Sequence, residues 1–367
     1  ERWRQRPGAR WPRAGHGSRA APLNAKARSA TGGAATLRPK DPRVTSPRPL
    51  LALLLLPFAS ACDATEPRAA AQAAIAGDEV TGATAASLGL PTPEAFAAEH
   101  GRFESYWYQG KAELTRYRLT QSRYGEARAG EAVLVFVTEP FLPDAQVKHE
   151  LADGQPDVSV LKLNHSRRFY TGVYPYSLMT SSFLPARGRE PALKVTHTMQ
   201  EWCGMAFAQL NRRADGVHVA QRSYFQAEGD EDAVVPAAPF EDALFAQVRR
   251  DPDALPTGTL SLVPALHHLR FAHRPIRPYA AELTRRQEVN EAVAEGPLEV
   301  LEVRYAELGR VLRVYFRAAF PHVIEGWEEE GRGPLTRAVR THSYLDAYWS
   351  RNGRGDARYR EALGGEL

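Results

Sequence analysis

The sequence predicts a mainly β protein, a large curved antiparallel sheet or open half-barrel with one or two short helices. Three observations predict this class. After Phe103 the chain is dense in β-branched and aromatic residues, its apolar runs are short, and turn residues separate the runs. Seven such runs fall within about 115 residues, a spacing typical of a meander with hairpin connections.

The chain after residue 90 begins with an expected short helix at 92–100 and continues into the meander. Residues 132–137 are apolar throughout, which predicts either a central strand or the floor of a cavity. In 193–200 apolar residues alternate with polar ones, the period of a half-buried strand. The expected strands of the meander are 111–123, 132–139, 158–163, 172–184, 193–200, 206–211 and 217–227.

The second half of the domain mixes helix and strand. Residues 240–250 carry Phe240, Leu244 and Val248 at helical spacing and end in two arginines, which suits the helix dipole. Residues 256–278 place leucines between prolines, so we expect irregular or short helical segments that cap an open face. Strands are expected again at 298–305, 311–320, 322–330 and 336–348, the last because its β-branched and aromatic residues favour a strand over a helix.

An apolar run at 49–61 ends in small residues and is followed by a cysteine. The run is shorter than the ~20 apolar residues that a membrane-spanning helix needs, and it has the length of the h-region of a secretory signal. Its end, Ala59-Ser60-Ala61-Cys62, resembles a lipobox, with Ala59 where that pattern usually has Leu. We therefore expect Cys62 to be lipidated.

The residues before this run indicate a signal region with a mis-extended start. A start at Val44 would leave a compact n-region with one positive charge. A disordered basic arm that binds nucleic acid is the alternative. We expect a signal region at 1–61, a flexible Ala-rich tether at 62–92 and a single β-rich domain at 93–367.

Charge separates these parts. Residues 1–61 hold 12 of the 47 Lys and Arg and 2 of the 43 Asp and Glu, which leaves 35 and 41 for residues 62–367. The mature chain is therefore mildly acidic, and we expect no nucleic-acid partner. The expected location is the cell envelope, with the lipid anchored in the inner or outer membrane and the domain facing the periplasm.

Several motifs resemble those of a family of β-rich bacterial envelope lipoproteins. They include Tyr-Trp-Tyr-Gln-Gly-Lys-Ala-Glu at 106–113, Tyr-Gly-Glu-Ala-Arg-Ala-Gly at 124–130, Phe-Val-Thr-Glu-Pro-Phe at 136–141 and Glu-Trp-Cys-Gly at 201–204. The resemblance covers most of residues 103–350 and implies an exported β-rich domain. Some members carry the label septum formation inhibitor, which properly belongs to nucleotide pyrophosphatases with a Ser-x-Ser-x-Arg-Arg segment. This chain has only Asn-His-Ser-Arg-Arg at 164–168, so that activity is not expected.

The sequence favours a non-enzymatic module that binds or carries a lipid-like or hydrophobic ligand, or binds a partner protein. An open antiparallel sheet must cover its inner face, and the apolar segment 260–271 is a candidate lid. The candidate lining residues are Leu134, Phe136, Leu266 and Phe271. We expect no cofactor and no metal.

Two other functions stay open. A periplasmic hydrolase acting on an envelope polymer would use groups such as His197 and Glu201, and a purely structural envelope factor would need neither. The sequence contains no Gly-x-Ser-x-Gly elbow, P-loop, His-Glu-x-x-His or Cys-x-x-Cys motif. Familiar hydrolase, phosphotransfer and metalloprotease sites are therefore disfavoured.

Cysteine and histidine residues have both a chemical and a structural interpretation. Cys203 with His197 or His218 would suit a thiol nucleophile and its base, but a small buried hydrophobe is favoured. The histidines at 267, 268 and 273 would suit zinc, but adjacent side chains point in different directions, which favours structural roles.

Several carboxylates and aromatic residues also have both a chemical and a structural interpretation. Glu325 and the glutamates at 328–330 would suit acid–base chemistry or calcium, but a solvated acidic turn is favoured. Several aromatic residues would suit stacking on a sugar, lining an acyl pocket, or cross-strand packing, which is favoured. These aromatic residues are Tyr106, Trp107, Tyr108, Tyr174, Tyr176 and Phe183.

Overall fold

The computed structural model describes residues 82–365, which belong to one compact unit. Fifteen strands form one antiparallel sheet, so the expected mainly β class is confirmed. The strands are β1 (Ala112–Arg123), β2 (Glu126–Leu142), β3 (Val147–Lys148), β4 (Val158–Thr171), β5 (Tyr174–Pro185), β6 (Lys194–Glu201), β7 (Gly204–Arg213), β8 (Gly216–Ser223), β9 (Glu231–Val235), β10 (Gly258–Leu262), β11 (Tyr279–Val289), β12 (Pro297–Tyr305), β13 (Arg310–Phe316), β14 (Ile324–Glu330) and β15 (Thr336–Asp346).

The sheet is a meander whose first strand lies in its middle. β1 pairs with β2 on one side and with the last strand, β15, on the other. From β2 the order continues through β4 to β9, and from β15 it runs back to β10, while β3 pairs only with β2. The sheet is therefore open, with β9 and β10 at its two edges, and its central seam joins the two ends of the domain.

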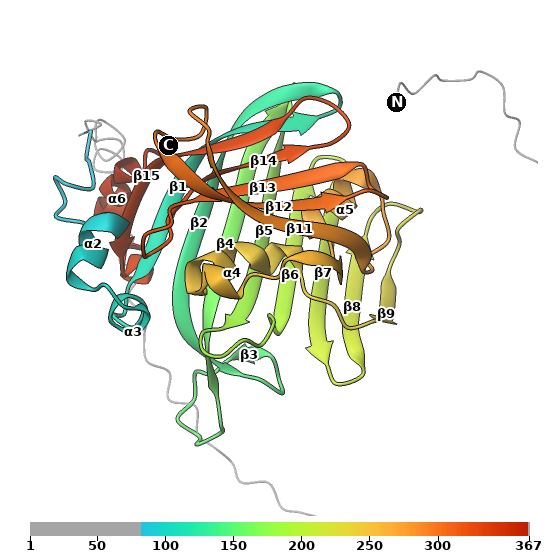
Figure 1. The fold of residues 1–367 in the computed structure, drawn as a ribbon, viewed down its shortest axis with the longest axis horizontal. Coiled ribbons are helices and arrows are strands. Elements are labelled where there is room, and N and C mark those ends of the chain that lie inside the picture. Colours follow the sequence, from blue (N-terminus) through green and yellow to red (C-terminus); the bar gives the residue numbers. More distant parts are fainter. Residues whose placement is uncertain (1–81, 366–367) are drawn as a thin grey trace, which may run out of the picture. The chain divides into compact units, whose positions relative to one another are not determined.

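The sheet curves so that its two halves face each other across one core. In Figure 1, β11 to β14 cross β4 to β8, and the helices α4 (Leu244–Arg250) and α5 (Leu266–Ala272) lie against β4 to β7. One cluster of buried side chains includes Leu163 of β4, Leu244 of α4 and Leu301 of β12. The concave face is thus largely filled by helices and side chains.

Five short α-helices occur in the described residues, more than the one or two expected. The predicted helix at 92–100 is confirmed as α2 (Pro93–Glu99), where the Thr92 hydroxyl accepts a hydrogen bond from the backbone of Ala95 at 3.2 Å. The prediction for 240–250 is confirmed by α4. The other helices are α3 (Phe103–Trp107), α5 and α6 (Ala357–Ala362). No helix within residues 82–365 is long and apolar enough to cross a bilayer.

The wholly apolar segment of β2 forms part of a central strand, as predicted, because β2 pairs with β1 and β4. Leu134 and Phe136 face the core. On the other face, Val135 belongs to a smaller cluster that includes Leu88 and Leu90. These two leucines lie within the expected tether, so packed chain begins before residue 93.

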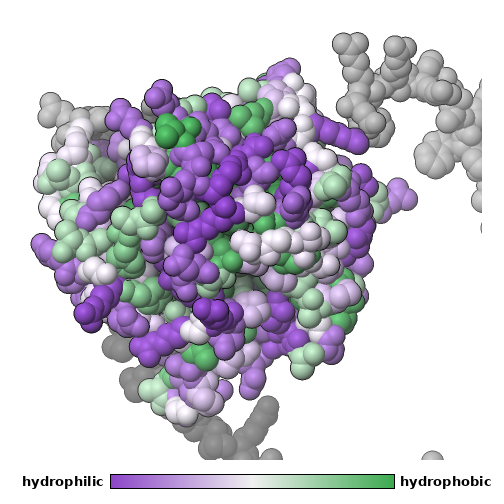
Figure 2. Space-filling model, viewed as in Figure 1, coloured by the Kyte–Doolittle hydropathy of each residue, from purple (hydrophilic) through white to green (hydrophobic). Residues whose placement is uncertain are grey.

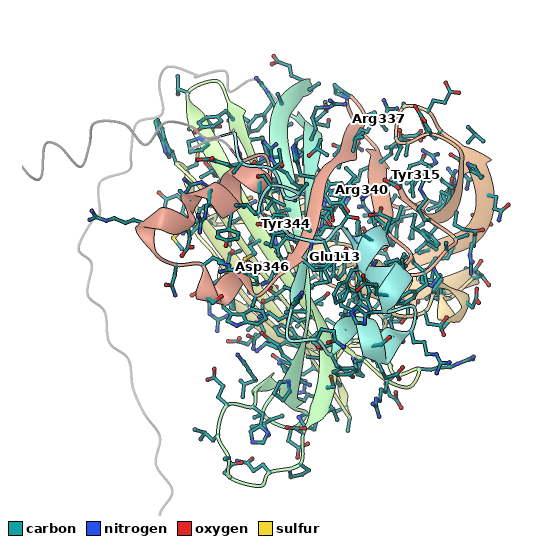
Figure 3. All side chains as sticks on the ribbon, turned by 90° about the vertical axis from the view of Figure 1, so that its left-hand side faces the viewer. Glu113, Tyr315, Arg337, Arg340, Tyr344 and Asp346 are labelled. Atoms are coloured by element: carbon teal, nitrogen blue, oxygen red, sulfur yellow. The ribbon has the colours of Figure 1, made fainter. Side chains whose placement is uncertain are left out.

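The run of glutamates near residue 328 forms β14, and the expected solvated acidic turn is wrong. Glu325 is buried and accepts a hydrogen bond from Arg340 Nε at 2.8 Å. Glu328 is also buried, between Tyr315 Oη at 2.8 Å and Arg337 Nε at 2.7 Å. Figure 3 shows these two arginines on β15 beside the neighbouring strands. Side chains of the neighbouring strands thus satisfy these two carboxylates in place of water.

The sequence does not predict β11, because its charged residues obscure the apolar pattern of a strand. Its Arg286 and the Arg313 of β13 both bind Glu302 of the strand between them, at 3.1 and 2.9 Å. Figure 2 shows hydrophilic residues gathered over this outer face of β11 to β14. The outer face of this half is thus held by ion pairs, while the inner face supplies the core.

Candidate ligand-binding site

The concave interior holds a chain of buried charges between the two halves of the sheet. Arg310 of β13 donates two hydrogen bonds to Glu241, at 2.7 and 2.8 Å. Glu329 of β14 lies 3.1 Å from Arg310 and 2.7 Å from Arg167 of β4, and its Oε2 lies 3.0 Å from Nε2 of His267. Burial opposes the charge on Glu329, but Arg167, His267 and Arg310 hold its pKa well below the ordinary value. Each carboxylate of this set forms an ion pair with an arginine, and through His267 the set links α5 to both halves of the sheet.

A second set of contacts fixes the far end of α5. Glu228, in the connection after β8, accepts hydrogen bonds from Arg270 Nη1 at 2.9 Å and from the Ser223 hydroxyl at 2.8 Å. Nδ1 of His273 lies 2.5 Å from the same carboxylate. We call Glu228 with Arg270 and His273 the latch. It joins the end of α5 to the edge of the sheet.

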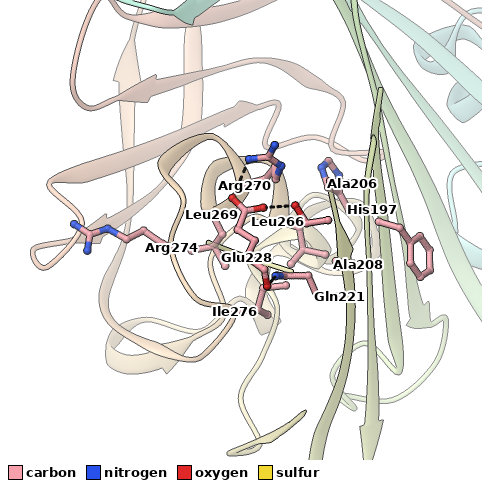
Figure 4. A pocket seen from close by; sticks show the side chains of 12 residues that line it. His197, Ala206, Ala208, Gln221, Glu228, Leu266, Leu269, Arg270, Arg274 and Ile276 are labelled. Carbon is pink, nitrogen blue, oxygen red and sulfur yellow. Dashed lines mark hydrogen bonds and ion pairs between the residues drawn. The ribbon is translucent and has the colours of Figure 1, made fainter. Parts of the chain in front are cut away.

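A small pocket lies between α5 and the inner face of β6 to β8 (Figure 4). Its volume is ≈ 20 Å³, against about 10–15 Å³ for a single water. The walls are mainly apolar, and the charged lining residues are Arg270, which pairs with Glu228 of the same lining, and Arg274. The apolar lining residues are Ala206, Phe207, Ala208, Leu266, Leu269 and Ile276.

Two polar groups of this pocket lack a full set of partners, Nε of Arg270 and the imidazole of His197 on β6. His197 is only 2 % exposed, and its Nδ1 lies 2.9 Å from the Thr180 hydroxyl. Its Nε2 is buried and makes no hydrogen bond within residues 82–365. Burial lowers the pKa of His197 to about 3, so the ring is neutral at pH 7. A neutral imidazole in this setting can still form one more hydrogen bond.

The buried histidines predict a loss of stability in mild acid. Burial lowers the pKa of both His197 and His268 to about 3, whereas an unfolded histidine titrates near ~6.5. The unfolded chain therefore binds more protons below pH ~6.5, and stability falls as the pH drops from there. Urea unfolding at pH 7.5 and pH 5 measures this. Replacing either histidine with Gln should reduce the acid-dependent loss by at least about 1 kcal/mol.

Asp242 is a control, because its protonation should change the stability with pH in the direction opposite to that of the histidines. Burial raises its pKa to about 7, so the folded chain holds a proton there that the unfolded chain has released. Its contribution to stability is therefore gained as the pH falls from 7 towards 4. Asp242→Asn should enlarge the acid-dependent loss. The same pH response in all variants would contradict these assignments.

The four residues predicted to line a ligand site lie in three different places. Leu134 and Phe136 pack in the core and do not line the pocket, whereas Leu266 forms part of its wall. Phe271 points to another cluster, where its ring lies 6.4 Å from that of Phe169. Cys62 lies outside the described residues.

The groups proposed for a hydrolase do not come together. Glu201 lies at the end of β6 and accepts a hydrogen bond from the Cys203 backbone at 2.6 Å, while His197 binds Thr180. The expectation that Cys203 is buried is wrong, because it lies exposed in the turn between β6 and β7. Glu201 also raises the pKa of the thiol, which disfavours a reactive thiolate.

The predicted histidine group is also dispersed. His267 contacts Glu329, and His273 belongs to the latch. Within residues 82–365 no group of three or more His, Cys, Asp or Glu side chains has an arrangement that could hold a metal ion. Structural roles, the favoured interpretation, account for the contacts of these two histidines.

Comparisons with known proteins find a similarity to a solved structure. No protein-family model and no curated protein matches the chain. Among solved structures, a β-barrel-like protein of the domain of unknown function DUF1849 from Brucella abortus matches with 10% sequence identity and a TM-score of 0.40. The match covers 64% of this chain and 98% of that chain. No residue role is carried over at this level of similarity.

Sequence reasoning missed the charged residues of the pocket and latch. Arg270 and Glu228 are 42 residues apart in the chain, and neither belongs to a recognisable motif. Arg274 follows α5 in a proline-rich segment that predicts only irregular structure. The sequence offered two signals for this region, the apolar lid segment that contains Leu266 and the alternating strand that contains His197.

Proposed function

We propose that this protein is a non-enzymatic binding module of the bacterial cell envelope, tethered to the inner or outer membrane by a lipid on Cys62 and facing the periplasm. Its β domain takes a small lipid-like ligand beneath α5. The observation that carries the proposal is the pocket under α5, where a buried imidazole nitrogen without a partner belongs to a mainly apolar lining. A buried polar atom of this kind is costly unless something binds it.

The lining determines the chemistry of the ligand. The apolar walls, among them Ala208 and Leu266, suit a methyl or acyl group. Nε2 of His197 suits an oxygen acceptor, above all a carboxylate. The exposed guanidinium of Arg274 extends away from the pocket in Figure 4 and meets that carboxylate only after it turns inward. The ligand class is therefore a small amphiphile with an anionic oxygen head.

Entry of such a ligand requires α5 to move outward, because ≈ 20 Å³ admits only a water-sized group. The C-terminal end of α5 suits this motion, while His267 near its start stays bound to Glu329. His273 has a left-handed backbone with φ of 50°, and the latch holds this end of the helix through side-chain contacts. Short segments of this kind can act as lids that hinge at their ends.

Titration of the full chain with decanoate, followed by calorimetry, tests the charged part of the site. Arg274→Gln should weaken decanoate binding about tenfold, since it removes a charge-assisted hydrogen bond. Arg277→Gln is the matched control, because Arg277 is an equally exposed arginine nearby that binds Glu307 instead. Equal effects of the two substitutions would indicate non-specific attraction by charge.

A second variant tests the cavity itself. Ala208→Val fills the space beside His197, so it should abolish decanoate binding and raise the melting temperature by filling a void. Native mass spectrometry of the purified protein should also show a bound acyl compound in the wild type alone. Unchanged decanoate binding in Ala208→Val would show that the pocket is not the site.

A further inference from the structure

Four turns at one end of β1 to β8 carry exposed apolar side chains. They are the turns that follow β1, β4, β6 and β8, and their most exposed residues are Tyr124, Val173, Trp202 and Tyr224. Val173 is 78 % exposed, Trp202 is 70 % exposed and Tyr224 is 76 % exposed. We call these four residues the tip cluster.

The tip cluster is held together by contacts between neighbouring turns. The Tyr124 hydroxyl lies 2.7 Å from that of Tyr176, and the Tyr174 ring stacks on Trp202 at 6.1 Å. The Tyr224 side chain, which follows β8, lies directly over Gly204 at the start of the neighbouring strand β7. The tips therefore form one connected surface. This surface includes two of the aromatic residues that the sequence offers for stacking or packing, Tyr174 and Tyr176.

The two ends of these strands differ in charge. The turns after β1, β4 and β6 read Tyr-Gly at 124–125, Gly-Val at 172–173 and Trp-Cys at 202–203, with no charged residue among them. The longer connection after β8 begins with Tyr-Phe-Gln-Ala at 224–227 and then carries Glu228 and Asp230. The connections at the opposite end contain Arg187, Arg189, Glu190 and Asp215. Leu151, which is 71 % exposed, lies in the connection between β3 and β4 at the opposite end, but the exposed aromatic residues of neighbouring turns gather at the tips. A patch of this kind marks a contact surface.

We infer that the tip cluster docks the domain onto the interfacial layer of a lipid bilayer. Trp and Tyr are the residues that settle at this layer, because their rings are apolar and their N–H and O–H groups remain wet. Arg123 lies directly behind the tips, 4.2 Å from the Tyr124 ring centroid and within 3.4 Å of the Tyr176 hydroxyl. Its guanidinium also lies 4.4 Å from the ring centroid of Phe271, so it supports the aromatic residues of the tips from behind.

The tether favours a bilayer as the partner. Nineteen residues lie between Cys62 and residue 82, and a chain of that length reaches at most about 70 Å. A domain anchored there stays close to the membrane, so even weak insertion of the tips is sufficient for docking. This step rests on the lipidation of Cys62 in the proposed function. The contact made by the tips does not depend on it.

The test uses the full chain carrying Cys62→Ser, which leaves Cys203 as its sole cysteine. Cys203 lies beside Trp202 at a tip, so an environment-sensitive NBD label there reports insertion directly. Labelling is done at alkaline pH because Glu201 raises the pKa of the thiol. Vesicles of phosphatidylethanolamine and phosphatidylglycerol should shift the NBD emission to the blue. The substitutions Val173→Ser, Trp202→Ser and Tyr224→Ser together should lower vesicle partitioning about tenfold or more.

The control moves the label to the other end of β7, using Cys203→Ser with Asp215→Cys, and its emission should not change. Emission shifts of equal size at both ends, or no sedimentation of the protein with vesicles, would overturn the inference. So would a dimer in sedimentation velocity that the three tip substitutions dissociate, because the tips would then bind a second copy. Decanoate binding by the same protein reports separately on the pocket.

Discussion

Arg249→Met is expected to lower the free energy of unfolding by about 3–5 kcal/mol, because it leaves a buried carboxylate without its counter-charge. Arg249 of α4 is 1 % exposed and Glu113 of β1 is 0 % exposed, and the two form an ion pair. The same carboxylate accepts a hydrogen bond from Tyr106 Oη at 2.5 Å. The guanidinium also lies 5.3 Å from the ring centroid of Phe136. Urea unfolding followed by circular dichroism measures the loss.

The double variant Glu113→Gln with Arg249→Met separates charge from packing. It removes both charges and keeps similar volumes, so it should recover much of the stability lost in Arg249→Met alone. If the double variant is as unstable as the single one, the loss comes from packing around α4 and not from the unpaired carboxylate.

Trp327→Ala is expected to cost about 3–5 kcal/mol, the range for deleting a large buried aromatic side chain. Trp327 of β14 is fully buried, and its ring lies 4.8 Å from Tyr117 of β1, 4.9 Å from His165 of β4 and 5.4 Å from Phe245 of α4. It thus joins strands from both halves of the sheet to a helix between them. The melting temperature and the urea midpoint should fall together.

Trp349→Ala is the matched control for that experiment. Trp349 follows β15 and is 50 % exposed, so its removal should change stability by no more than about 0.5 kcal/mol. A comparable loss in both variants would mean that Trp327 contributes no more than a surface residue.

The fold class and most strands could be predicted because local pattern decides them. The alternation in β6 and the wholly apolar segment of β2 depend on which face of a strand meets the core, and that information is in the sequence. The errors occur where charge hides the pattern. Glu325 and Glu328 are typical of a solvated turn until Arg340 and Arg337 are brought beside them.

The candidate site was less predictable for the same reason. His197 could be placed on an alternating strand, but the sequence does not show that α5 covers it or that Glu228 holds the helix in place. Such contacts join segments far apart in the chain. Their energies depend on the curvature of the whole sheet, and no short motif records that curvature.

The pairing of β1 with β15 imposes an order on biosynthesis. Ala112 stands opposite Asp346 in the central seam, so the two halves cannot be joined until the final strand has been made. Contacts between such distant segments slow folding and leave unpaired edges exposed in the meantime. A polypeptide truncated shortly before residue 336 would carry nearly all of the core residues, but without β15 it could not pair β1 with β14 through the central seam. Chains that lack β15 therefore stay open along this seam and exposed to proteolysis.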